Sequence, residues 1–214
     1  MQLRNGKVNT EWPVLIRYEN DEAISKAMDV LLITWKTKQS LKQYEVVHER
    51  RYIGCGSASQ VYRYQDVVAK IFYQEDDLMH VQMDDIYILP SIDHIPIYPK
   101  CYGFVPKTMI FKEYIEGPLL ESFEGKISTS IWNRFFNGLI DTVLCGFMPT
   151  DLYSFNIIVS KRGLVVVDVG AFKCQPKNNK IVYPSFLEED IPFVKPAKRI
   201  FENVVQSRGF QVIH

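Results

Sequence analysis

The sequence predicts an α+β protein of two small lobes, with a β-rich first half and a helical second half. Runs of β-branched and aromatic residues fill positions 44–73 and 101–116, and Gly, Ser and Asp separate them. Such runs are typical of antiparallel strands joined by short connections. From residue 128 onward, apolar residues recur at helical spacing instead. The change falls near residues 117–127, so we expect a first lobe over 1–117, including an N-terminal extension, and a second over 118–214.

The first lobe is expected to contain two helices and at least six strands. A strand is predicted over 14–18, a helix from Asp21 to about Trp35, and three adjacent strands within 44–73. A second helix is predicted over 76–90, ending before Pro90 because proline interrupts helical hydrogen bonding. Two further strands are predicted over 101–105 and 108–117, where Gly117-Pro118 turns the chain.

The second lobe is expected to be mainly helical. Residues 128–147 predict a long helix, capped by Ser128 or Ser130, with apolar side chains along one face. Residues 156–170 predict a short hairpin, and residues 196–205 predict a final helix.

Composition narrows the possible partners and compartments. The chain has 214 residues, with 25 Lys and Arg against 25 Asp and Glu, so no overall field attracts nucleic acid or an anionic membrane surface. Its four cysteines form no CxxC pair, which argues against a disulfide framework or a zinc site and favours a reducing compartment. No stretch has the length of a membrane span. We expect a cytoplasmic protein, with secretion as an effector left open.

The first segment that suggests a functional site is residues 53–62, IGCGSASQVY, which contains two glycines one residue apart. Gly54 and Gly56 permit a tight turn whose amide groups can approach phosphate oxygens. A GxG in an ordinary β-hairpin is the alternative. A strand follows the glycines, which disfavours a dinucleotide-binding fold, where a helix follows.

Lys70 is the second candidate. It lies in the apolar run VVAKIF, on the same side of the predicted strand as Val68 and Phe72, while Ala69 and Ile71 face the other way. A buried lysine needs an anion, and a phosphate and a carboxylate on the following helix are the candidates. The alternative is an edge-strand lysine with its ammonium in water.

Three oxygen-bearing side chains form the third candidate. Asp151 and Asn156 lie five residues apart in a predicted loop, and Asp168 ends the apolar run LVVVDVG. A carboxylate can activate a hydroxyl, and Mg²⁺ prefers carboxylate and amide oxygens. Each residue alone is more often part of a turn or cap.

Taken in order, these segments resemble the eukaryotic-type protein kinase superfamily over roughly residues 45–172. GCGSASQV resembles the Gly-rich loop, VAK the third-strand lysine motif, and FKEYIEG the hinge. The resemblance implies that Lys70 holds the α- and β-phosphates of ATP and that backbone groups of 113–115 meet adenine. The ATP-binding residues that it implies are Gly54, Gly56, Ser57, Val61, Ala69, Lys70, Glu113 and Ile115.

The resemblance extends to catalysis. TDLYSFN is similar to the catalytic loop and DVG to the metal-binding DFG motif. It implies Asp151 as the catalytic base, with Lys70 as a second catalytic residue, and Asn156 and Asp168 as ligands of Mg²⁺. In place of the usual glutamate partner of Lys70, the following helix offers Asp84 and Asp85, and alignment favours Asp85.

The chain also departs from the family pattern. Pro149 and Thr150 replace the usual His-Arg, Lys112 stands where an apolar gatekeeper is typical, and only 44 residues follow Gly170. The resemblance therefore implies one two-lobed kinase-like domain over 1–214 with a reduced helical C-lobe, similar to minimal bacterial Ser/Thr kinases. The expected activity is ATP- and Mg²⁺-dependent transfer to a protein Ser or Thr hydroxyl. A small-molecule (antibiotic- or sugar-type) kinase and a pseudokinase are the alternatives.

Overall fold

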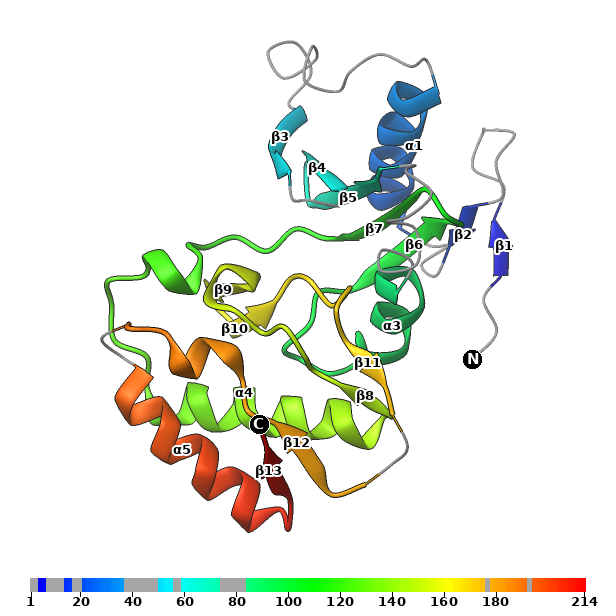
Figure 1. Cartoon of the computed structure of the whole chain (residues 1–214). Helices are drawn as coiled ribbons and strands as arrows, with labels where there is room; N and C mark the ends of the chain where they lie inside the picture. Colours follow the sequence, from blue (N-terminus) through cyan, green and yellow to red (C-terminus); the bar gives the residue numbers. More distant parts are fainter. Residues whose placement is uncertain are drawn as a thin grey trace. The chain divides into compact units, whose positions relative to one another are not determined.

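The computed structural model describes residues 4–6, 14–16, 21–36, 50–55, 59–73, 84–175, 178–191 and 194–214 (Figure 1). The chain forms two compact units, one from residues 1–86 and 100–114 and the other from 87–99 and 115–214. The architecture is mixed α+β, as predicted. Among the described helices, none combines the length and apolar character needed to cross a membrane.

The first unit is built on a seven-stranded antiparallel sheet in the order β1-β2-β6-β7-β5-β4-β3. Its strands are β1 (Arg4–Gly6), β2 (Val14–Ile16), β3 (Arg50–Cys55), β4 (Ser59–Tyr64), β5 (Val67–Phe72), β6 (Cys101–Val105) and β7 (Met109–Glu113). The predicted three-strand meander is confirmed by the antiparallel pairing of β3, β4 and β5. The strand predicted over 108–117 ends earlier, at Glu113.

One face of this sheet is covered by α1 (Glu22–Lys36), the first predicted helix. The Asp21 carboxylate accepts hydrogen bonds from the amides of Ala23 and Ile24, at 3.1 and 3.2 Å, which begins the helix. The buried cluster between helix and sheet consists of Ala27, Met28, Leu31, Leu32, Tyr62, Val67, Ala69, Ile71, Val105, Met109 and Phe111. This face is therefore the apolar core of the unit.

The predicted end of the second helix is wrong. Helix α3 (Asp84–Ile92) contains Pro90 instead of stopping before it. Local hydrogen bonds carry the chain past the proline, since Ser91 Oγ donates to Tyr87 O and the Asp93 amide to Leu89 O. Residues 76–83 of the predicted helix lie outside the described residues.

The second unit is organised around α4 (Thr129–Leu144). Ser128 is its N-cap and accepts from the Ile131 amide at 3.4 Å, which decides between the two predicted capping serines. Aromatic side chains line the buried face of the helix. The Trp132 ring stacks on Phe136 and on Phe186, with centroids 5.5 and 5.9 Å apart.

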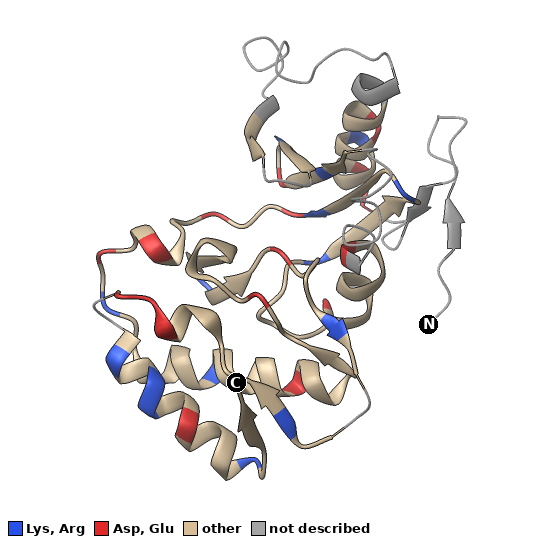
Figure 2. Ribbon diagram, in the orientation of Figure 1, with Lys and Arg blue, Asp and Glu red and all other residues tan. Residues whose placement is uncertain are grey.

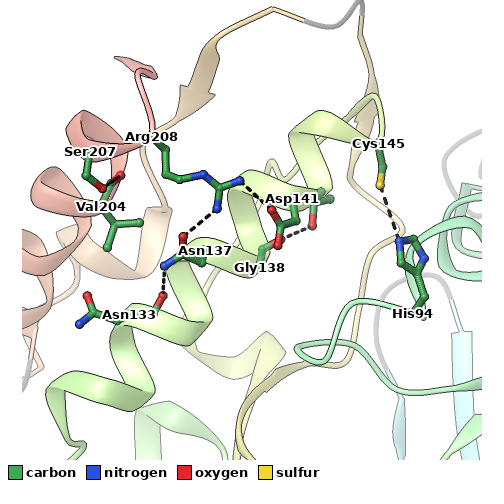
Figure 3. A network of polar contacts seen from close by, with 10 residues as sticks. His94, Asn133, Asn137, Gly138, Asp141, Cys145, Val204, Ser207 and Arg208 are labelled. Atoms are coloured by element: carbon green, nitrogen blue, oxygen red, sulfur yellow. Dashed lines mark hydrogen bonds and ion pairs between the residues drawn. The ribbon is translucent and has the colours of Figure 1, made fainter.

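Helix α5 (Val194–Ser207) packs on α4 and confirms the final predicted helix, with two more residues at each end. Its buried side chains are Val194, Ala197, Phe201, Val204 and Val205. Charged residues of both signs cover its exposed side (Figure 2). After the helix, Arg208 donates to Asn137 Oδ1 and Asp141 Oδ1 of α4, at 2.8 and 2.9 Å (Figure 3).

Short strand pairs complete the second unit. The hairpin β9 (Ile157–Ser160) and β10 (Gly163–Val166) confirms the prediction. Two other pairs were not predicted: antiparallel β8 (Phe147–Met148) with β11 (Lys173–Cys174), and parallel β12 (Lys180–Val182) with β13 (Gln211–Ile213). Single-turn helices occur as η2 (Leu120–Ser122), η3 (Ser154–Asn156) and η4 (Ser185–Glu188).

The aromatic packing gives a stability prediction. Phe136 is fully buried and contacts the rings of Trp132, Phe186 and Phe201. Phe136→Ala should lower the free energy of unfolding by about 3–5 kcal/mol, because the lost contacts leave a cavity. Urea unfolding followed by circular dichroism measures this. Asn133→Ala, at an exposed position of the same helix, should change it by less than about 0.5 kcal/mol. Equal effects of the two changes would contradict the packing described.

Candidate functional site

Lys70 lies on the face of the sheet opposite α1. Val61 of β4 and Ile110 of β7 stand directly across from it in the strand register. Residues that oppose one another in neighbouring strands share a face, as does Val68 two positions away. Ala69, which the resemblance placed among the nucleotide-binding residues, belongs to the α1 core and faces the other way. Val68, and not Ala69, therefore accompanies Lys70.

The Lys70 ammonium forms a buried ion pair with Asp85 at the start of α3. Nζ and Oδ2 are 2.8 Å apart, and the two side chains are 8% and 1% exposed. This confirms the predicted carboxylate partner on the following helix. Apart from this ion pair, neither carboxylate oxygen of Asp85 has a hydrogen-bond partner among the described residues, so the Lys70 ammonium is the charge partner of Asp85. Such a carboxylate is stable in the interior only beside a cation.

Two more basic side chains share this face. Lys112 of β7 and Arg63 of β4 both stand across from Val68. Lys112 is buried, whereas the Arg63 guanidinium lies 3.5 Å from the centre of the Tyr114 ring. Cations gathered on one sheet face, with valines between them, suit an anionic ligand that also has an apolar part.

The predicted hinge is held at its start by backbone hydrogen bonds. The Glu113 amide donates to Lys100 O and the Tyr114 amide to Asp66 O, both at 2.9 Å. The Ile115 amide makes no hydrogen bond with another residue that the structure describes. Of the three backbone amides at 113–115, that of Ile115 is therefore the one whose N–H has no acceptor among the described residues.

The glycine loop is described only in part. Gly54 lies at the irregularity in the β3–β4 register, and a Cβ added there would meet no described heavy atom within 4 Å. Local packing therefore does not require a glycine at this position. Gly56 and Ser57, two further predicted ligands, lie outside the described residues.

In the second unit, two loops meet because the strands that flank them pair. Residues 149–156 connect β8 to β9, and residues 167–172 connect β10 to β11. The β9–β10 and β8–β11 pairings bring both loops to one place. The Val167 amide donates to Asn156 O at 2.9 Å, and Thr150 Oγ1 donates to Ala171 O. Asp168 is therefore brought to the loop that carries Asp151 and Asn156, as the sequence predicts.

The polar groups at this junction are oriented by local hydrogen bonds. Asp151 is exposed, and its φ of +57° lies in the left-handed region. Its carbonyl oxygen accepts from Asn156 Nδ2 at 3.4 Å, which leaves the Asn156 amide oxygen as that side chain's acceptor. Asp168 Oδ1 accepts from the Gly170 amide at 3.0 Å, which orients this carboxylate.

This donor set fits Mg²⁺. No group of three or more His, Cys, Asp or Glu side chains in the described part of the chain is arranged to hold a metal ion. Mg²⁺ does not need one, because proteins commonly bind it through one or two carboxylates while substrate phosphates and water complete the octahedron. The Asp168 carboxylate and the Asn156 amide oxygen would supply the protein's share.

Sequence reasoning missed the residues that support these loops. Tyr98 is buried, its hydroxyl lies 2.8 Å from Thr142 Oγ1, and its ring packs edge-on against Phe172 of the second loop. Burial raises the pKa of the Tyr98 hydroxyl above its usual value, so the group stays neutral. In the first loop, the Ser154 amide donates a hydrogen bond to Glu189 Oε1 at 3.0 Å. No periodic signal in the sequence links residues so far apart.

Comparison of the chain with models of protein families and with curated protein sequences gives no match.

The buried ion pair gives a second prediction. Lys70→Met should lower the free energy of unfolding by about 3–5 kcal/mol, because Asp85 loses its charge partner. Adding Asp85→Leu should restore most of the loss, since a matched apolar pair can replace a buried ion pair. Urea unfolding of both variants tests this, with Lys26→Met, at an exposed position of α1, as control. A double variant less stable than Lys70→Met would refute the pairing.

Proposed function

We propose that the protein is an ATP- and Mg²⁺-dependent phosphotransferase of two-lobed, kinase-like architecture that phosphorylates a Ser or Thr hydroxyl of a protein. The observation that carries the proposal is the meeting of Asp151, Asn156 and Asp168 on two adjoining loops. The buried Lys70–Asp85 pair supports it. Phosphoryl transfer depends mainly on positioning and charge neutralisation, and these are the group types that it needs.

In this proposal the first unit binds the nucleotide. Lys70 contacts the phosphates, and Asp85 keeps its ammonium in place on the sheet. Val61 and Val68, which share this sheet face with Lys70, pack against the base.

The second unit supplies the groups that act on the acceptor and the metal. Asp151 accepts the proton of the attacking hydroxyl and orients it, which its exposed position allows. Asn156 and Asp168 hold Mg²⁺ through one oxygen each. When bound, the metal neutralises charge on the phosphates and ATP provides the phosphoryl group.

Nucleotide binding is the first consequence to test. A ligand that binds only the folded protein stabilises it by about 2.7 kcal/mol at a hundred times its Kd. For a chain of this size we expect MgATP to raise the melting temperature by about 5–10 °C. ATP with EDTA should raise it less. A folded protein whose melting temperature does not respond to saturating MgATP would rule out nucleotide binding.

The roles of the two aspartates give the test of catalysis. Asp151→Asn should keep MgATP binding near wild type but slow transfer by about two orders of magnitude, the usual scale for a general base. Asp168→Asn removes a metal-ligand charge and should weaken Mg²⁺-dependent binding itself. Labelled ATP, with the protein itself and cell-extract proteins as acceptors, measures transfer, and calorimetry measures binding. Asp190→Asn, at an exposed position, is the matched control.

The outcomes separate the alternatives. Equal transfer by wild type and Asp151→Asn would refute the catalytic-loop assignment. Labelling of small hydroxyl compounds but of no protein would identify a small-molecule kinase. Binding of MgATP without any transfer, autophosphorylation included, would identify a pseudokinase.

A further inference from the structure

The proposed catalytic loop, residues 151–156, has one buried side and one exposed side. Leu152 and Ser154 are each 1% exposed, whereas Tyr153 and Phe155 are 38% and 49% exposed. Asp151 is exposed as well. The loop therefore exposes Asp151, the proposed base. The buried residues Leu152 and Ser154 must hold the loop in place.

Both buried residues are bonded to the segment around η4. The two oxygens of the Glu189 carboxylate bind one residue, because Oε1 accepts from the Ser154 amide at 3.0 Å and Oε2 accepts from Ser154 Oγ. One turn away, the Phe186 amide donates to Leu152 O at 2.9 Å. Without Glu189, a buried amide and a buried hydroxyl would lose their acceptor.

The η4 segment is in turn fixed to the core of the second unit. Phe186 is fully buried and nearly parallel to Trp132 and Phe136, at interplanar angles of 8° and 6°. The Glu189 amide donates to Phe186 O at 3.3 Å, so the backbone of Glu189 is held to the same turn as Phe186. Hydrogen bonds thus connect Ser154 to a rigid aromatic core.

The loop needs such a support because its backbone is strained. Asp151 keeps a left-handed φ of +57°, which a non-glycine residue holds only where its surroundings determine it. Asn156 Nδ2 reaches back to the Asp151 carbonyl across the same short segment. A shift of Ser154 would therefore move the proposed base and the proposed metal ligand together.

We infer that Glu189 is a positioning residue for phosphoryl transfer. Through Ser154 it holds the loop in the conformation that places Asp151 and Asn156. The inference rests on the proposed function, and no periodicity or motif in the sequence points to it. Misplacement of a catalytic group by about 1 Å can cost a factor of about 100 in rate, so removing the Glu189 carboxylate should lower mainly kcat.

The test compares two neighbouring glutamates of the same turn. Glu189→Gln should lower kcat at least about tenfold while KM for ATP stays within about twofold, since the nucleotide-binding residues are untouched. Hydrogen–deuterium exchange should rise in the peptide covering 151–156. Glu188→Gln, at an exposed position beside it, should change neither. Ser154→Ala should act in the same direction, and its effect should not add fully to that of Glu189→Gln.

Several results would overturn the inference. One is wild-type kcat in Glu189→Gln, and another is unchanged exchange over 151–156. A third is a loss of kcat that merely follows a lower melting temperature and disappears in assays run well below it, which would give Glu189 a role in stability alone. Should Glu189→Gln not fold, the same readouts on Ser154→Ala decide.

Failure of the proposed function is separately visible. A wild-type protein that transfers no phosphate refutes that function whatever Glu189 does. The exchange measurement then still decides whether Glu189 holds the loop: faster exchange in Glu189→Gln supports this role, and unchanged exchange refutes it.

Discussion

The flat stack of Trp132, Phe136 and Phe186 is the contact on which the second unit depends. It joins α4 to η4, which lie about fifty residues apart in the chain. Stacked aromatic rings bury a large apolar area at low cost in side-chain entropy and allow few alternative geometries. Because η4 also bonds the 151–156 loop, the rigidity of this apolar core reaches a polar and exposed segment. The chemistry proposed for Asp151 relies on that connection.

The first unit shows a different constraint, the separation of two sheet faces. The buried cluster beneath α1 consists of apolar and aromatic side chains, whereas the opposite face mixes Lys70, Lys112 and Arg63 with valine and isoleucine. Burying charge on a sheet costs free energy of desolvation, and a simple structural role would be served better by leucine. At Lys70 the buried carboxylate of Asp85 offsets this cost.

Much of the fold could be predicted because its longer elements are amphipathic. The α1, α4 and α5 patterns and the β3–β5 meander are visible in the sequence, and so is the alternation that separates Lys70 from Ala69. Strands of two or three residues, such as β8 and β11, have too few positions to show a period. Pro90 misled because hydrogen bonds from Ser91 and Asp93 continue the helix past it. These depend on local geometry that residue type alone does not determine.

Some residues of the candidate site could likewise be predicted from the sequence, and others could not. Asp151, Asn156 and Asp168 could be found from residue type and spacing, since hard oxygen ligands in loops at strand ends form a recognisable pattern. Glu189 and Tyr98 could not, because their roles arise from contacts between distant segments. Residues that act directly leave a signal in the sequence, while those that support them become visible only in three dimensions.

Lys70 also determines how the sheet can assemble. All six residues of β5 are buried, and except for Lys70 all are apolar, so hydrophobicity alone would tolerate pairing shifted by one residue. A shift of one residue exchanges the two faces of a strand. It would place the ammonium among the apolar side chains beneath α1 and leave the Asp85 carboxylate without its cation. A single lysine thereby excludes the misregistered sheet, whatever ligand it binds in the correct one.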